Sequence, residues 1–148
     1  MTDKWGRRLF KTGGVVLILL GLVHAISLFR KMAGSNDTER QLIGLMNSYR
    51  FNLMGSMRSM ADLLQGFSAA FMLAALGMGV MDLAVARERA GLLKRVALVN
   101  VIWLATMVAV SLRYFFAAPT TSLSLVLVIF LLAWWQLPAE ETRSNSAG

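Results

Sequence analysis

Polar side chains within apolar stretches are the places where this chain could do chemistry. His24, the single histidine, stands in the apolar run GLVHAISLF. Asp62 and Gln65 stand three residues apart in a second apolar run, a spacing that places them on one helix face. Arg58 precedes Asp62 by one turn, and Arg113 lies at the end of a third run. Polar and ionisable groups in membrane spans are functional candidates by default, so these five residues are the candidates for a ligand pocket. Arg58, Asp62 and Arg113 lie close to the predicted headgroup level, where a structural or anchoring role is the alternative.

His24 has three chemical roles open to it: a hydrogen bond between helices, the lining of a ligand pocket, or ligation of a metal or haem. Because the chain has one histidine, two histidines of the same chain cannot ligate a haem, and His/Met ligation or a site shared in a dimer would be needed. No cluster of histidines and carboxylates predicts a metal site. A nucleophile with an oriented base is also not recognisable, so the catalytic residues stay unknown.

The composition indicates a membrane protein. Hydrophobic residues make up 57% of the 148 residues and charged residues 16%, with a net charge of +7. Soluble domains carry about 45–50% apolar and about 25% charged residues. The basic residues flank apolar runs and do not alternate with aromatic residues, which favours contact with lipid and argues against nucleic acid. Cysteine is absent, which excludes disulfides and thiolate chemistry.

Four apolar runs are long enough to cross a bilayer, which takes roughly 20 residues. We expect an all-α fold, a transmembrane four-helix bundle in a single domain over residues 1–138. The predicted spans are about 13–31, 59–82, 95–116 and 120–137, and 139–148 is predicted to be a polar disordered tail. The first run resembles a signal peptide in its basic start, but His24 and the continued apolar stretch favour an uncleaved helix.

The polar segment between the first two spans predicts a short interfacial amphipathic helix. Asn36 or Asp37, followed by Glu39, is typical of a helix N-terminus. The apolar residues that follow indicate one hydrophobic face, and the segment is too short and too charged to span. An extended or turn segment is expected around Asn52 to Gly55.

Helix rise, about 1.5 Å per residue, groups the polar residues by depth. Asp62 and Arg113 share one predicted layer, and His24 and Gln65 share the next, so Asp62 is expected to pair with Arg113 or Arg58 and His24 to reach Gln65. Asn100 falls near the opposite boundary. Gly66, Ala70 and Ala74 recur every four residues, and this small-residue face is predicted to pack against another helix.

The distribution of basic residues predicts the orientation. The link between the second and third spans carries four basic residues, and the first residues of the chain are also basic. This bias predicts a bacterial inner-membrane protein with both termini in the cytoplasm. Predicted partners are membrane lipids and either a second copy of the chain or another membrane protein.

The stretches GLVHAISLF and GSMRSMADLLQGFSAAFMLAALGMGVMDL together resemble a family of uncharacterised four-helix bacterial membrane proteins, and more loosely the DoxX-like group. The matching positions are Gly21, Leu22, His24, Asp62, Leu63, Gly66 and Phe67. The resemblance covers the first two helices and implies a fold without a defined activity.

The predicted function is that of a non-enzymatic binding or accessory protein for a lipid, a quinone or a membrane-protein partner. The alternative is a membrane enzyme, or a haem or electron-transfer component, that uses His24 and the face of Asp62 and Gln65.

Overall fold

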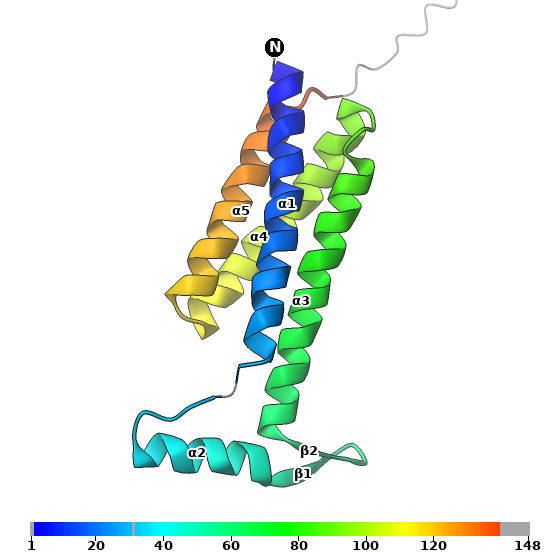
Figure 1. Cartoon of the computed structure of the whole chain (residues 1–148). Coiled ribbons are helices and arrows are strands. Elements are labelled where there is room, and N and C mark those ends of the chain that lie inside the picture. The colour runs from blue at the N-terminus through cyan, green and yellow to red at the C-terminus, as the bar shows by residue number, and fades with distance from the viewer. Residues whose placement is uncertain (1, 31, 140–148) are drawn as a thin grey trace, which may run out of the picture. The chain divides into compact units, whose positions relative to one another are not determined.

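The computed structural model describes residues 2–30 and 32–139, and these residues form five helices and one hairpin (Figure 1). The elements are α1 (Thr2–Leu28), α2 (Asp37–Ser48), β1 (Arg50–Leu53), β2 (Ser56–Ser59), α3 (Met60–Val85), α4 (Ala90–Tyr114) and α5 (Ala117–Gln136). Helices α1, α3, α4 and α5 are long and apolar enough to cross a membrane. The predicted all-α fold of a multi-pass membrane protein is confirmed. The tail was predicted over 139–148, and its residues from 140 onward lie outside the described residues.

The chain divides into two compact units. The first unit combines the residues up to Leu19 with those from Gly77 onward, and the second unit is Leu20–Leu76. Helices α1 and α3 each contribute residues to both units. The first unit therefore contains helical residues from all four spans, whereas the second contains the segment that links α1 to α3.

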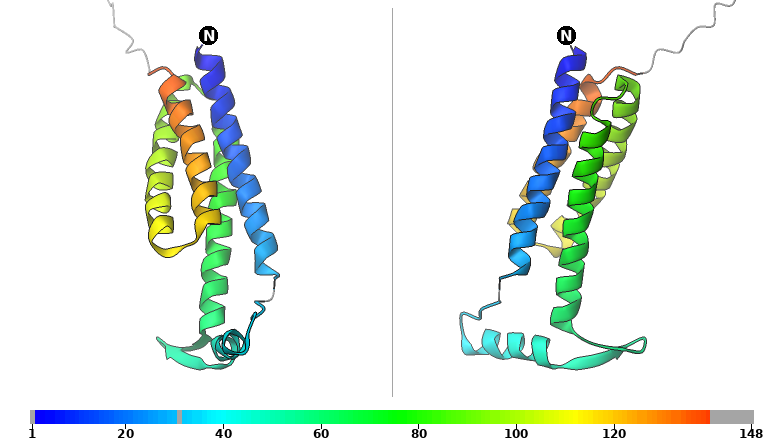
Figure 2. Two further views of the ribbon diagram at one scale, coloured as in Figure 1. Left: turned by 90° about the vertical axis from the view of Figure 1, so that its left-hand side faces the viewer. Right: turned by 45° about the vertical axis from the view of Figure 1, so that its right-hand side comes forward.

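The core of the first unit lies where α4 and α5 pack side by side against the first half of α1 (Figure 2). The ring of Phe10 meets that of Phe130 edge to face, with centroids 5.7 Å apart. The buried apolar side chains of α4 and α5 are Leu93, Ala97, Leu104, Leu123, Val126, Phe130 and Ala133. Burying each large aliphatic or aromatic side chain away from water contributes about 1.5–3 kcal/mol to the free energy of folding. This contribution is smaller for side chains that face lipid.

Glycines allow a close helix approach in the first unit. A Cβ on Gly79 would lie 2.6 Å from the backbone oxygen of Gly14, so two backbones meet there and no side chain fits. Gly13 likewise makes room for the Phe130 ring. This close approach of α1 and α3 thus uses glycines of both helices, which is the small-residue packing expected in lipid.

The second unit contains the predicted interfacial helix, α2, which lies crosswise to the beginning of α3 in both views of Figure 2. The Asn36 side chain accepts a hydrogen bond from the Glu39 N–H at 2.9 Å, which confirms the predicted helix start. No side chain of α2 is buried, and Leu42 and Leu45 are exposed. An exposed apolar face on a short polar helix is suited to the membrane interface.

A two-residue turn joins β1 to β2. The antiparallel register pairs Leu53 with Ser56, so Met54 and Gly55 form the turn, with φ of 50° and 90°. Two successive positive φ values are the geometry of a type I′ hairpin turn. Asn52 Oδ1 accepts from the Gly55 N–H at 2.8 Å and supports this turn. The predicted extended or turn segment is therefore a tight hairpin.

Three helices begin earlier than the predicted spans, among them α4, which begins at Ala90 and was expected from about residue 95. Helix α1 begins at Thr2, where Arg7 pairs with Asp3 one turn away. Helix α5 begins at Ala117 and includes Pro119 in its first turn. A proline there removes an N–H that has no helical partner in any case.

Candidate functional site

Asp62 closes a capping box at the beginning of α3. Its N–H donates to Ser59 Oγ at 3.1 Å, and its Oδ2 accepts from the Ser59 N–H at 3.0 Å. This reciprocal pair satisfies two backbone donors that the first helical turn leaves unpartnered. The direct ion pair predicted between Asp62 and Arg58 is not formed among the described residues. Arg50 and Arg58 are nevertheless close enough to act on the carboxylate electrostatically.

A hollow of about 750 Å³ opens beside this cap in the second unit. We call it the α3 groove, and its lining residues are Arg50, Arg58, Asp62, Leu63, Gln65, Gly66, Phe67, Ala69 and Ala70. Charged and amide groups therefore line it together with apolar and small residues. Three of the five predicted pocket residues, Arg58, Asp62 and Gln65, contribute to this single hollow.

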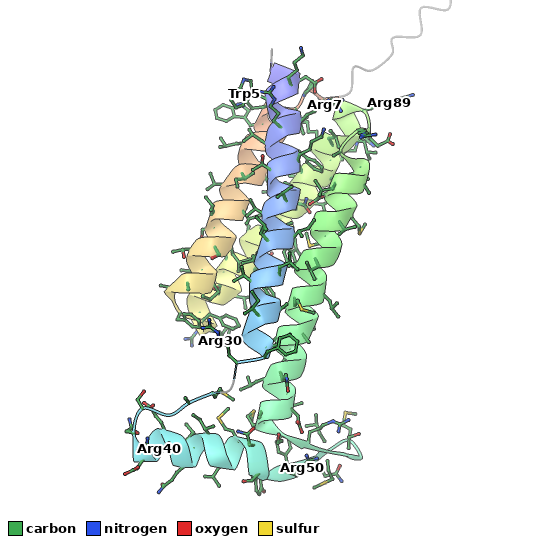
Figure 3. All side chains as sticks on the ribbon, viewed as in Figure 1. Trp5, Arg7, Arg30, Arg40, Arg50 and Arg89 are labelled. Carbon is green, nitrogen blue, oxygen red and sulfur yellow. The ribbon has the colours of Figure 1, made fainter. Side chains whose placement is uncertain are left out.

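A second hollow, of about 490 Å³, lies in the same unit and shares Gln65 with the α3 groove. It is lined by Leu28, Phe29, Arg30, Met32, Asn47, Ala61, Leu64, Gln65 and Ser68. Figure 3 shows Arg30 after the last turn of α1 and Arg50 on the hairpin. Among the described residues Gln65 makes no side-chain hydrogen bond, so its amide is available to both hollows.

The floor of the α3 groove is open because of a glycine. A Cβ built on Gly66 would meet nothing within 4 Å. Gly66, Ala70 and Ala74, the predicted helix-packing face, are all exposed in the structure. Phe67 is 71% exposed and stands beside Gly66 in the groove lining. We call the apolar part of the groove lining, at Gly66, Phe67, Ala69 and Ala70, the channel.

His24 is not among the residues that line either hollow. Its ring packs edge-on against Phe71, with centroids 5.1 Å apart and planes at 72°. Arg113 belongs to the first unit, where its guanidinium lies 5.6 Å from the centre of the Tyr114 ring. The structure thus brings Arg58, Asp62 and Gln65 together in the groove and gives His24 and Arg113 aromatic neighbours.

One buried polar pair was not predicted. Asp82 and Asn100 are 2% and 4% exposed, and Asn100 Nδ2 donates to both carboxylate oxygens of Asp82, at 2.8 and 3.0 Å. The pair joins α3 to α4 within the first unit. The signal in the sequence was weak: Asp82 lies three residues before the end of α3 and Asn100 ten residues after the beginning of α4, so helix rise alone does not place both at the membrane boundary. Only Asn100 had been placed near that boundary.

Other polar contacts of the first unit hold helix ends. Arg7 Nη1 donates to the Glu88 carbonyl at 2.6 Å, and Lys94 Nζ donates to the Leu137 carbonyl at 2.7 Å. Carbonyls at helix ends have no helical partner, and cations near a C-terminus also favour the helix dipole. Figure 3 shows Trp5, Arg7 and Arg89 at this end of the first unit.

In the described residues no group of three or more His, Cys, Asp or Glu side chains is arranged to hold a metal ion. The α3 groove offers guanidinium donors, one carboxylate, an amide and an apolar channel.

Comparison of the chain with protein-family models, with curated proteins and with solved structures finds no match. The resemblance to DoxX-like proteins stays a prediction.

Proposed function

We propose that this multi-pass membrane protein binds a membrane lipid in the α3 groove and acts without catalysing a reaction. The observation that carries the proposal is the composition of the groove, where two arginines and Asp62 meet the open channel at Gly66. The groove therefore has a charged part and an apolar part, as a lipid has a charged headgroup and an apolar chain.

The headgroup end of the groove is supplied by the hairpin and the first turn of α3. Arg50 begins β1 and Arg58 lies on β2, directly before the Ser59 cap. A guanidinium binds phosphate through two parallel N–H donors. The type I′ turn and the capping box hold the two strands and the helix start in a defined geometry, which lowers the entropy lost on binding.

The chain end of the groove follows the small residues of α3. Gly66 and Ala70 leave a channel in which an acyl chain can contact the helix backbone closely. The groove volume, about 750 Å³, lies within the range of roughly 300–1,000 Å³ that is usual for small-molecule sites.

The test compares two glycine variants of the same helix. Gly66 and Gly77 are both exposed on α3, and a Cβ at either meets nothing within 4 Å. Only Gly66 lines the groove. Native mass spectrometry of protein extracted in a mild detergent is expected to show retained lipid for the wild type and for Gly77→Leu, with loss for Gly66→Leu. Equal lipid retention in all three proteins would reject the proposed function.

A membrane-protein partner is the competing occupant of this channel, because the exposed face of Gly66, Ala70 and Ala74 also suits a second helix. If Gly66→Leu changes the oligomeric mass and leaves lipid retention unchanged, the channel is an interface between proteins. A Soret absorption band in the purified protein would instead favour the haem alternative through His24.

We also propose that the hairpin faces the outside of the inner membrane and that both termini are cytoplasmic. The exposed basic residues of the first unit support this orientation, among them Lys4, Arg8, Lys11, Arg87, Arg89 and Arg95. The natural sequence has no cysteine, so single cysteines can report it. In intact cells a membrane-impermeant maleimide should label Asn52→Cys and spare Glu88→Cys. The reverse pattern would invert the topology.

A further inference from the structure

We propose that the α3 groove selects a lipid whose headgroup carries both a phosphate and a primary ammonium group, which is an aminophospholipid. This inference rests on the proposed function and names its ligand class. The residues that carry it are the three charged residues that line the groove: Arg50, Arg58 and Asp62.

The charges of the groove have both signs. Arg50 and Arg58 provide two positive charges, and both act electrostatically on the negative charge of Asp62. A lipid that carries only negative charge would satisfy the arginines and repel the carboxylate. Specificity often comes from such a repulsive element, so the carboxylate discriminates against purely anionic headgroups. A zwitterionic headgroup matches both signs.

The Asp62 carboxylate can accept a hydrogen bond from a ligand. Its Oδ2 accepts from the Ser59 N–H at 3.0 Å, and Ser59 is the one described residue that donates to it. Asp62 is exposed, and a carboxylate has about four acceptor sites, so it can also accept from outside the protein. A primary ammonium group carries three N–H donors, as a lysine side chain does, whereas a quaternary ammonium group carries none. The groove is thus expected to distinguish a primary amine from its trimethylated form.

The neighbouring residues place these groups at the head of the channel. Asp62 and Gln65 lie one helical turn apart, and Gln65 makes no side-chain hydrogen bond among the described residues. Its amide can donate to an ester carbonyl below the phosphate. Gly66 and Phe67 follow and form the apolar part of the lining. Along α3 the order is therefore carboxylate, amide, apolar lining, so the polar groups lie at one end of the groove and the apolar groups at the other.

The experiment measures lipid binding by native mass spectrometry with the full chain in mixed micelles. The probes are phosphatidylethanolamine, phosphatidylcholine and phosphatidylglycerol with identical acyl chains. The wild type is expected to retain phosphatidylethanolamine about tenfold better than phosphatidylcholine, the size expected for one charge-assisted hydrogen bond. Asp62→Asn should remove this preference and improve phosphatidylglycerol binding. The asparagine keeps an oxygen that can accept from the Ser59 N–H, so the helix cap is preserved.

Asp37→Asn is the matched control, because Asp37 is an exposed acid of α2 that pairs with Arg40 and does not line the groove. It should retain the wild-type preference. If the wild type binds the three lipids equally, the inference is overturned, whether or not Asp62→Asn folds. An unchanged lipid preference in a folded Asp62→Asn variant overturns it as well. Gly66→Leu separates the two proposals. If that variant loses lipid while the wild type shows no headgroup preference, the proposed function stands and only the headgroup class is rejected.

Discussion

The buried pair of Asp82 and Asn100 allows the sharpest test of the packing in the first unit. Asn100→Leu removes the amide that donates to both carboxylate oxygens, at 2.8 and 3.0 Å, and leaves Asp82 at 2% exposure without its donor. Hydrogen bonds to charged groups contribute about 1.5–3 kcal/mol, and an unsatisfied buried group costs its full desolvation free energy. We therefore expect a loss of about 2–3 kcal/mol in the free energy of unfolding.

The double variant Asp82→Leu/Asn100→Leu tests the reason for this loss. Replacing both partners by apolar groups of similar size removes the unsatisfied carboxylate, so the double variant should be more stable than Asn100→Leu alone. Thr106→Val is the control on α4, since Thr106 is exposed and its hydroxyl donates only to the Ile102 carbonyl.

The assay is thermal unfolding in detergent, followed by circular dichroism. A loss of 2–3 kcal/mol corresponds to a decrease in Tm of roughly 5–10 °C for a domain of this size. The reasoning is refuted if Asn100→Leu melts with the wild type, or if the double variant melts below the single variant.

Three further predictions concern the local geometry. Gly79→Val should prevent the close approach to the Gly14 backbone oxygen and abolish folded yield, measured by monodisperse elution, whereas Gly66→Val should elute as the wild type does. Ser59→Ala should lower the free energy of unfolding by about 1 kcal/mol through loss of the α3 cap, and a Tm equal to that of the wild type would contradict the capping role. Gly77→Ala should raise that free energy by about 0.5–1 kcal/mol, because the site is open and helical; a lowered Tm would show that Gly77 is needed for contact with another chain.

Local sequence patterns predicted the elements well. The four apolar runs and the Asn36 cap each depend on neighbours in the chain, and the structure has a spanning helix for every run and the expected start of α2. The partner of Asp62 was predicted less well: an arginine was expected, whereas in the structure Asp62 bonds to Ser59. Ser59 is three residues away and holds its position through the backbone, so its bond to Asp62 requires little ordering of long side chains, unlike an exposed ion pair with an arginine.

The candidate site was predicted in part, because only some of its residues are neighbours in the sequence. Asp62 and Gln65 lie one turn apart on α3, so helix geometry brings both to the groove, and Arg58 lies on β2 directly before the cap of that helix. Arg50 comes to the groove through the hairpin register, which a type I′ turn at Met54 and Gly55 sets. Methionine rarely adopts a positive φ, so the residues gave little signal for that turn.

By itself, the sequence determined the spanning helices, the interfacial segment and the face of α3 that carries the polar residues, because each follows from composition and helical periodicity. Tertiary structure decided which small residues bring helices together and which polar residues pair. Gly14 meets Gly79, and Asp82 meets Asn100, because of how α1, α3 and α4 are rotated about their axes in the first unit. Apart from a few polar residues, the helices of these apolar runs are hydrophobic on most of their surface, and so their rotation is selected by close packing and by the polar groups that need a partner.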